Sequence, residues 1–440
     1  MWRTAALDFY QRTKVEAYVR RYSSLKNAGR ARIQAYRDER LRRLVHHAFH
    51  NVPYYWKMMR EREIAPERVQ TAADLRLFPV LERETVRREG KNLLATGLPQ
   101  GRMRSGSTGG TTGSPLTFTH DIEGYSAGLA AGHFLRGLSG WKAGRLHVRL
   151  GGDPAVRGRW NRRNSREEDV LLRQTHLSVP YPEDPGMIAA LADRIVALDP
   201  DSIEGPPSLL HALARNAQDR GLVFRTLVRV FSTGELLDSR EKRTIEIALA
   251  PVADLYGCGE VFWIASRPAH EDRYYVCDPH VIVETENSRI AGMKDLLVTN
   301  LDNRGLPLIR YRAGDLIEGL REPEPDDRLP LTSFHRIIGR NSEIIHLPNG
   351  LSLHPLQAFG GNLFRLYPAI SRHRVVWNGR SLLFLFEAAG PFPREELERR
   401  LAQWIRPFGA EYSIEYATTL GPPAEGTPGV YEIINRDARR

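Results

Sequence analysis

Apolar side chains in the first fifty residues follow the spacing of helices. Between residues 4 and 50 they recur at intervals of three and four, which lines one helix face with hydrophobic groups. These positions are Leu7, Tyr10, Val15, Tyr18, Val19, Ile33, Tyr36, Leu41 and Leu44. Six arginines accompany them, and we expect these to form a solvated face: Arg30, Arg32, Arg37, Arg40, Arg42 and Arg43. The pattern predicts a helical N-terminal extension over residues 1–50.

From about residue 120, helical windows alternate with short runs rich in β-branched residues. Windows at 189–198, 209–218 and 240–249 each precede a short apolar run. Such alternation is typical of parallel strands with crossover helices, where ligands bind at the carboxyl ends of the strands. Runs at 276–284 and 295–301 have no helical window between them, so they predict antiparallel strands. We therefore expect an α/β protein with mixed sheets.

The pattern changes again beyond residue 340. Strand-like segments at 373–377, 382–386 and 412–416 accompany a helical segment at 394–405. They predict a small, mobile α+β lobe of about 100 residues. We place a large domain at 1–339 and the lobe at 340–440.

Composition narrows the class of protein. A chain of 440 residues with 41% hydrophobic residues can bury a large core, and no apolar run approaches the roughly 20 residues that span a bilayer. The N-terminus shows no secretory signal, and two cysteines do not make a disulfide framework. We expect a cytoplasmic protein without a membrane partner. Despite a net charge of +10, the basic residues are spread along the chain, so nucleic-acid binding is not expected.

The stretch from Ser105 to Pro115 is rich in glycine, serine and threonine. Glycines allow close backbone approach, and N–H and hydroxyl groups donate to anionic oxygens, so the loop suits a polyphosphate. The phosphate-cradle candidates are Ser107, Thr108, Gly110, Thr111, Thr112 and Gly113. The stretch is not a Walker A motif, because Ser114-Pro115 follows Gly113 where lysine and serine or threonine are required. A flexible linker is the alternative.

Three further motifs follow in order along the chain. They are Ser232-Thr233-Gly234-Glu235, Tyr256-Gly257-Cys258-Gly259-Glu260 and the stretch from Pro307 to Asp315, with Gly339-Arg340 soon after. This ordered set resembles the core motifs of the adenylate-forming (acyl-CoA synthetase) superfamily. Within it, the set resembles the phenylacetate-CoA ligase branch, which includes coenzyme F390 synthetase-like and CapK-like proteins. Residues 44–55 also resemble the entry sequence of that branch.

The resemblance implies activation of a carboxylic acid by ATP and Mg²⁺. It implies that Tyr256 stacks on adenine, Glu260 ligates Mg²⁺ and Asp315 accepts the ribose hydroxyls. The implied nucleotide contacts also include Ser232, Gly234, Glu235, Gly257 and Arg312, and the implied catalytic residues are Thr111, Glu260 and Arg340. The acyl site is implied at Gly205, Pro206, Phe262 and Trp263, although aromatic residues there could equally belong to the core.

Two other clusters carry weaker hypotheses. Five arginines between 157 and 166 could receive a phosphorylated acceptor such as CoA or an acidic carrier protein, but a solvated loop is favoured. Cys258, His270, Cys277 and His280 raise a zinc hypothesis because some relatives in this branch carry a Cys/His metal site nearby. The spacing is not a recognised zinc motif, and no C-x-x-C pair is present, so zinc is the less favoured interpretation.

The small lobe departs from the family pattern. By resemblance, Gly429 stands where the family has the lysine that contacts the substrate carboxylate and the α-phosphate, and no lysine follows Lys294. The family's aspartate-rich hinge is replaced by Asn341-Ser342-Glu343 after Gly339-Arg340. A full cycle of adenylation and thioester formation therefore requires another cation, and Arg436 is one candidate.

Three hypotheses follow from these motifs. The first is an ATP-dependent adenylate-forming ligase that passes its acyl group to CoA, an acyl carrier protein or an amine. The second is an acyltransferase or ligase half-reaction that uses a pre-activated acyl group, and the third is a catalytically impaired nucleotide- or acyl-binding partner. A homodimer is left open. Retention of both Glu260 and Asp315 counts against the third hypothesis.

Overall fold

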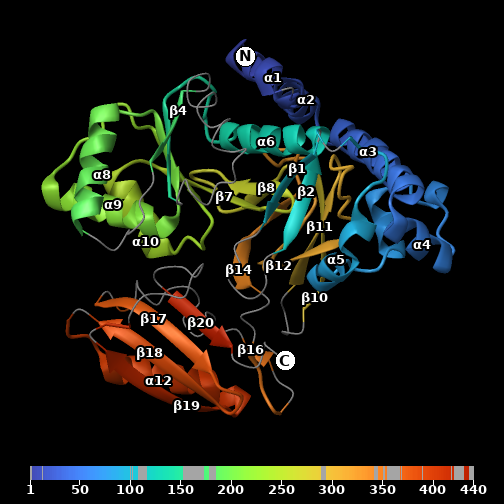
Figure 1. Ribbon diagram of the computed structural model, residues 1–440. Coiled ribbons are helices and arrows are strands. Elements are labelled where there is room, and N and C mark those ends of the chain that lie inside the picture. The colour runs from blue at the N-terminus through green and yellow to red at the C-terminus, as the bar shows by residue number, and fades with distance from the viewer. Residues whose placement is uncertain are drawn as a thin grey trace.

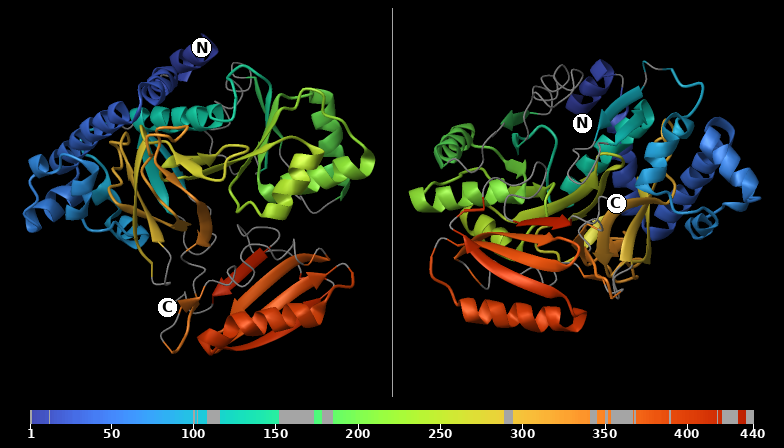
Figure 2. Two further views of the ribbon diagram at one scale, coloured as in Figure 1. Left: turned by 180° about the vertical axis from the view of Figure 1, so that it is seen from behind. Right: turned by 60° about the horizontal axis from the view of Figure 1, so that its bottom comes forward.

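The structure is a computed structural model. It describes residues 2–11, 13–99, 101, 103–107, 116–151, 173–177, 185–288, 294–340, 345–349, 352–353, 367, 369–388, 390–417, 419–420 and 431–435. Helices and several sheets alternate along the chain, which confirms the predicted α/β class. Figures 1 and 2 show α3 to α5 and α8 to α10 at opposite flanks of a large body, with a smaller lobe below.

The N-terminal residues form separate helices. These are α1 (Trp2–Gln11), α2 (Val15–Ala28), α3 (Arg30–Asn51), α4 (Pro53–Glu61) and α5 (Arg83–Glu89), with 3₁₀ turns η1 (Pro66–Arg68), η2 (Ala72–Leu77) and η3 (Gly90–Leu93). Gly29 separates α2 from α3 with a φ of +88°, a conformation that glycine adopts without strain. The apolar stripe therefore runs over several helices.

The prediction that all six arginines of α3 are solvated was wrong for two of them. Arg37 and Arg40 are buried, because acidic residues of the sheet body lie beneath the helix. The Nη1 of Arg37 donates to Oδ1 of Asp278 at 3.1 Å, and Arg40 donates to the buried Asp302. Helix periodicity shows which residues share a face, but it does not show that a charged residue has a buried partner.

An eight-stranded sheet forms the first part of the body. Its strands are β3 (His147–Leu150), β4 (Gln174–Leu177), β5 (Ser202–Gly205), β6 (Arg229–Thr233), β7 (Val252–Cys258), β8 (Phe262–Arg267), β9 (Tyr274–Val276) and β13 (Ser333–Phe334). Their order is β13-β9-β8-β7-β6-β5-β3-β4. The neighbouring strands from β4 to β7 are parallel, as predicted, and the pairs from β7 to β13 are antiparallel.

Helices cover both faces of this sheet. The crossover helices α8 (Pro185–Leu198), α9 (Pro207–Arg220) and α10 (Ser239–Ala248) pack on a core that includes Val148, Ile203 and Val230. The opposite face, with Phe231 and Ala253, packs against α2 and α6 (Ile122–Gly137). Successive residues such as Val230 and Phe231 thus enter different cores, as the alternation of a strand requires.

The second part of the body is an antiparallel sheet of β10 (Val281–Asn287), β11 (Lys294–Asn300), β12 (Tyr311–Glu318) and β14 (Arg336–Arg340). It shares a core with α3 and α4, to which Leu41, Tyr55 and Val298 contribute. A separate hairpin of β1 (Met103–Ser107) and β2 (Thr117–Asp121) leads into α6. The antiparallel section was predicted correctly around residues 281–300.

The described residues from 345 onward have a core of their own. β17 (Ile370–Trp377), β18 (Ser381–Ala388), β19 (Glu411–Ala417) and β20 (Tyr431–Asn435) form one sheet, and β15 (Ile345–His346) pairs with β16 (Ser352–Leu353). Helix α12 (Arg394–Ile405) matches its predicted limits and buries Leu397 and Leu401, while η7 (Arg406–Phe408) follows it. This is the α+β arrangement that the sequence pattern predicts.

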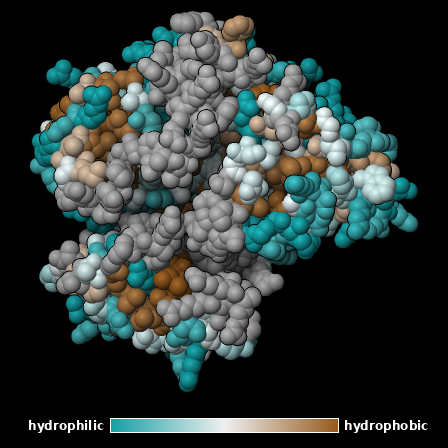
Figure 3. Space-filling model, in the orientation of Figure 1, coloured by the Kyte–Doolittle hydropathy of each residue, from teal (hydrophilic) through white to brown (hydrophobic). Residues whose placement is uncertain are grey.

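Hydrophobic residues reach the visible surface in separate patches, as Figure 3 shows. Among the described residues, no helix combines the length and apolar character needed to cross a bilayer.

The buried pair of Arg40 and Asp302 supplies a stability prediction. In Arg40→Met the Asp302 carboxylate remains buried without its cation, so the free energy of unfolding should fall by about 3–5 kcal/mol. Arg43→Met is the matched control on the same helix, because Arg43 pairs with Glu39 at the exposed surface and should cost less than about 1 kcal/mol. Chemical denaturation followed by circular dichroism measures both values. Equal losses in the two variants would contradict the assigned role of Arg40.

Candidate functional site

The glycine-rich loop joins the two strands of a hairpin. Ser107 at the end of β1 pairs in register with Thr117 at the start of β2. The Oγ of Ser105 and Oγ1 of Thr119 lie 3.1 Å apart across the hairpin. The other loop candidates, Thr108, Gly110, Thr111, Thr112 and Gly113, lie outside the described residues, as does the side chain of Ser107. Both ends of the predicted phosphate loop are nevertheless placed.

One aromatic ring fixes this hairpin against the Tyr256–Glu260 motif. A Cβ on Gly106 would meet the ring of Phe118 at 2.7 Å, and a Cβ on Gly259 would meet the same ring at 2.8 Å. Neither position can therefore carry a larger residue unless the ring moves. The contact brings the phosphate-loop hairpin next to the turn that bears Glu260.

His120 makes a second link between the hairpin and this turn. Its Nε2 lies 3.1 Å from the carbonyl oxygen of Gly259, and its Nδ1 lies 3.2 Å from Nδ2 of Asn303. The neutral tautomer that satisfies both contacts donates from Nε2 and accepts at Nδ1. Burial lowers the pKa of His120 to about 4, and a second proton would face the Asn303 donor.

The motif residues converge at the junction of β7 and β12. The phenol of Tyr256 donates to Oδ2 of Asp315 at 2.6 Å. The hydroxyl of Tyr311 donates to Oε1 of Glu260 at 3.1 Å, and Glu260 is only 4% exposed. Residues that lie more than fifty positions apart in the sequence thus meet in one polar cluster, as the ordered motifs predict.

An arginine without a sequence motif joins this cluster. The Nη1 of Arg83, the first residue of α5, donates to Oε1 of Glu260 at 2.8 Å. The backbone holds α5 there, because Leu81 N–H donates to the Arg310 carbonyl at 3.0 Å and Arg312 N–H donates to the Leu81 carbonyl at 3.1 Å. Sequence reasoning missed Arg83 because 177 positions separate it from Glu260. Tyr311 could have been found, since it lies inside the Pro307–Asp315 motif.

Arg340 is placed by strand register. It is the cross-strand partner of Asp315 in the antiparallel pairing of β12 with β14, and Gly339 pairs with Leu316. The backbone of the last predicted motif thus adjoins the ribose-site candidate.

The side chains of Ser232 and Arg312, two predicted nucleotide contacts, pair with carboxylates of the protein. The hydroxyl of Ser232 is fully buried and donates to Oδ1 of Asp254 at 2.5 Å. The guanidinium of Arg312 donates to Glu82 at 3.0 Å and to Glu286 at 2.5 Å, and it also contacts Asp295. Both side chains are thus paired with carboxylates of the protein, and their predicted contacts with a nucleotide stay predictions.

The remainder of the Ser232–Glu235 motif shapes a turn. Gly234 has a φ of +87°, and Oε2 of Glu235 accepts a hydrogen bond from the backbone N–H of Ser208 at 3.2 Å, in the first turn of α9. Burial raises the pKa of Glu235. This carboxylate satisfies a free N–H group at a helix start.

The two aromatic acyl-site candidates, Phe262 and Trp263, pack against helix α6. A Cβ on Gly128 would lie 2.5 Å from the ring of Phe262, and one on Gly132 would lie 2.6 Å from that of Trp263. One turn earlier, a Cβ on Gly124 would lie 2.7 Å from the Cα of Asn303. Three missing side chains on one helix face therefore make room for the two predicted acyl-site aromatics and for Asn303.

Backbone geometry fixes where these aromatics stand. Phe262 has a φ of +68°, unusual for a bulky residue, and a Cβ on Gly257 would lie 2.2 Å from its carbonyl oxygen. Gly257 is thus required for close packing of the turn. In the same sheet, two strands away from β7, Gly205 ends β5 and Pro206 precedes α9. The four candidates thus lie on β5, on β8 and at the start of α9.

The zinc hypothesis gains no support. Within the described ranges, no three or more His, Cys, Asp or Glu side chains are grouped to hold a metal ion. His280 is fully buried and lies 3.0 Å from the Val261 carbonyl and 3.3 Å from Asp302, while His270 is exposed. The five arginines at 157–166 and Gly429 lie outside the described residues.

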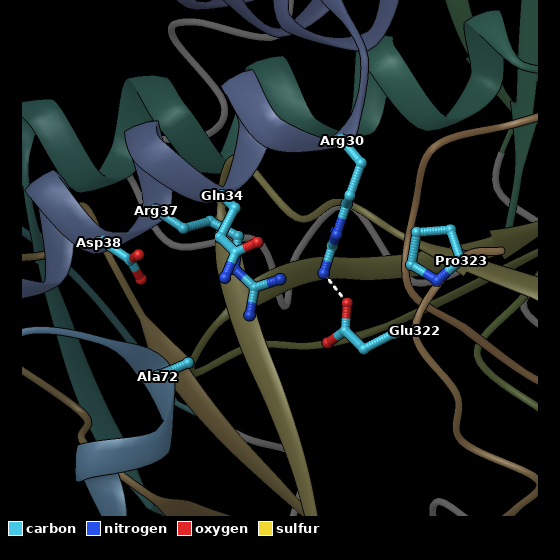
Figure 4. A pocket seen from close by; sticks show the side chains of 7 residues that line it. All are labelled: Arg30, Gln34, Arg37, Asp38, Ala72, Glu322 and Pro323. Carbon is cyan, nitrogen blue, oxygen red and sulfur yellow. Dashed lines mark ion pairs between the residues drawn. The ribbon is translucent and has the colours of Figure 1, made fainter. Parts of the chain in front are cut away.

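A cleft of about 340 Å³ lies elsewhere, beside α3 (Figure 4). Its lining residues are Arg30, Gln34, Arg37, Asp38, Ala72, Glu322 and Pro323. Arg30 forms an ion pair with Glu322, and its Nη1 donates to Asp278 at 2.6 Å. These charges fasten α3 to the body, and the cleft shares no lining residue with the predicted nucleotide or acyl site.

Comparisons with known proteins agree with this geometry. No family model matches the chain. Protein CapK of Staphylococcus aureus is 21% identical over 70% of the chain and 68% of its own length, and the phenylacetate-coenzyme A ligase of Escherichia coli K12 is 25% identical over 74% and 75%. The crystal structure of 2-hydroxyisobutyryl-CoA ligase in the postadenylation state superposes with a TM-score of 0.70 at 18% identity, covering 93% of this chain and 90% of that one.

These findings define the class of protein. The fold is that of the adenylate-forming superfamily. In sequence, the chain is similar to CapK and to phenylacetate-coenzyme A ligases.

The buried His120 supplies a pH prediction. Its pKa is about 4 in the native state and near 6.5 when unfolded, so the unfolded state binds the proton first. Its contribution to stability is present above pH 6.5 and is lost as pH falls from 6.5 to 4, with a slope of up to about 1.4 kcal/mol per pH unit. Denaturation at several pH values should show a smaller loss for His120→Gln than for the wild type. The exposed His46, changed to Gln, should leave the profile unaltered, and parallel profiles for all three proteins would refute the prediction.

Proposed function

We propose that the protein is an ATP- and Mg²⁺-dependent adenylate-forming ligase. A carboxylate oxygen of the acid attacks the α-phosphorus of ATP, and the bond to pyrophosphate breaks. A thiol or amine then attacks the acyl carbon, and AMP leaves. The acceptor is CoA, a carrier protein or an amine. The observation that carries the proposal is the meeting of the Tyr256–Asp315 pair, Glu260 and the phosphate-loop hairpin in one place.

Each part of this cluster suits one part of the nucleotide. Asp315 accepts the ribose hydroxyls, and Tyr256 stacks on the adenine. The hydrogen bond of Tyr256 to the same carboxylate supports these adjacent roles. Ser107, Thr108, Gly110, Thr111, Thr112 and Gly113 donate to the phosphates. The position of both hairpin ends beside Gly259 supports that role.

Glu260 suits a magnesium ligand. Mg²⁺ usually binds one or two carboxylates together with water and substrate phosphates, so a single buried carboxylate beside a phosphate loop fits it. When bound, Mg²⁺ neutralises charge on the phosphate oxygens. Tyr311 orients Glu260 through its 3.1 Å hydrogen bond, and Arg83 balances the charge of this carboxylate before the ion binds.

Arg83 also supplies a cation close to the proposed phosphate site. The family lysine is replaced by Gly429 in this sequence. Arg83 stands beside the carboxylate proposed to hold the metal, and 40% of its side chain is exposed, so it can turn from Glu260 toward a phosphate oxygen. We place the hinge of the lobe at residue 340, next to Asp315, with Arg340 as its contact to the nucleotide.

The test is carboxylate-dependent exchange of pyrophosphate with ATP, across aryl, short-chain and amino acids. Glu260→Gln should abolish the exchange because it removes the proposed metal ligand. Arg83→Met should lower it about 100-fold because it removes a cation aimed at the phosphates. Arg87→Met, one turn later on α5, is the matched control, since Arg87 pairs with the exposed Glu84 and should have little effect.

Each outcome separates the hypotheses. Full exchange in Glu260→Gln would refute the metal assignment, and equal activity in the two arginine variants would refute the role of Arg83. Acyl transfer from a supplied adenylate, without exchange in the wild type, would show the half-reaction enzyme instead. Nucleotide binding without either reaction would show a binding partner.

A further inference from the structure

A buried ion pair lies directly beside the acyl-site candidates. Glu204 is the residue before Gly205 and is almost fully buried. Arg136 of α6 donates to both of its carboxylate oxygens, from Nε at 2.5 Å and from Nη2 at 3.0 Å. The guanidinium of Arg136 also stacks on Trp263, with its central carbon 4.8 Å from the ring centroid. The bidentate pair balances the charge of Glu204.

A second arginine lies beside this ion pair and adds a positive charge, although Arg136 alone already balances the charge of Glu204. Arg149 is the cross-strand partner of Glu204, and its Nε lies 3.2 Å from Oε1 of that carboxylate. Its side chain is 37% exposed. Within the described part of the chain, no residue pairs with its two Nη groups. These donors are directed neither at a second carboxylate nor at a backbone carbonyl of those residues.

The neighbouring titratable groups do not cancel this charge. His147 lies 3.7 Å from Glu204 and contacts Ser202 Oγ at 2.8 Å through Nδ1. Burial lowers the pKa of His147, and it lowers that of His133 on α6 to about 3, so both rings are neutral near pH 7. With one carboxylate and two guanidinium groups, the described cluster carries one excess positive charge.

The position of this charge connects it to the acyl group. Arg149 lies one residue before the end of β3, and Gly205 ends the adjacent parallel strand. In such sheets the carboxyl ends of the strands border the ligand. A pocket for a neutral aryl group would gain nothing from a partly desolvated excess cation, because removing a charge from water is costly unless a counter-charge is supplied.

We propose that the acyl pocket takes a carboxylic acid with a second anionic group at its distal end, such as the free carboxylate of a dicarboxylic acid, and that Arg149 pairs with it. The inference rests on the proposed function, whose acyl site it specifies. Arg149 sets the choice of acid, whereas Arg136 holds Glu204 and Trp263 in position.

Pyrophosphate exchange with acids of matched length tests the proposal. Adipate is compared with hexanoate, and terephthalate with 4-methylbenzoate, in wild type and Arg149→Met. The wild type should prefer each diacid by about 10- to 100-fold in kcat/KM, the usual range for a hydrogen-bonded charge pair. Arg149→Met should abolish that preference while activity toward the neutral acids persists, and Arg149→Lys should restore part of it.

Arg145→Met is the matched control. Arg145 precedes the same strand, is 68% exposed and pairs with Asp201 outside the cluster, so its preference should equal that of the wild type. Because the readout is a ratio of two acids in one protein, partial unfolding does not imitate the result. Preference for the neutral acids in the wild type, or an unchanged ratio in Arg149→Met, would overturn this inference alone. Silence with every acid would overturn the proposed function as well.

Discussion

Neutralisation of one buried carboxylate holds the large body together. Asp302 is completely buried, and it is contacted by Arg40 from α3, by the Tyr22 hydroxyl of α2 at 3.1 Å, and by His280. The arginine and histidine contacts keep the pKa of Asp302 below its usual range even though burial opposes this. A charge with this degree of burial requires all its partners at once. The N-terminal helices are therefore part of the core that they cover.

Asp302 belongs to a turn at residues 300–303, here called the central turn, which also organises the candidate site. Oδ1 of Asn300 accepts the backbone N–H groups of Asp302 and Asn303 at 3.0 and 3.2 Å. Asn303 in turn donates to the Thr119 carbonyl at 2.9 Å and faces His120. Fixing the carboxylate thus fixes the hairpin that carries the phosphate loop. The site and the N-terminal helices depend on one short stretch of backbone.

Regular spacing and ordered motifs could be recognised in the sequence, whereas pairs of side chains far apart in the chain could not. The parallel strands, helix α12 and the Tyr256, Glu260 and Asp315 motifs could be predicted, because periodicity and ordered motifs are local signals. The partners of Arg40, Arg83 and Arg312 could not be predicted, because each of these arginines contacts a carboxylate that lies far away in the sequence. The hydrogen bond from the Ser232 hydroxyl to Asp254 on the next strand was likewise not predicted.

Three of the four glycines of helix α6 lie at intervals of four residues, and the vacancy left by each missing side chain holds a different part of the protein. Asn303 belongs to the central turn, Phe262 to the segment after Glu260 and Trp263 to the predicted acyl site. An α-helix repeats every 3.6 residues, so rotation by one position would swing all three vacancies about 100° away from their occupants. The packing of this face therefore fixes the rotation of α6 about its own axis. The helix cannot rotate without displacing the central turn and both aromatic rings. These three regions therefore keep one fixed arrangement relative to each other.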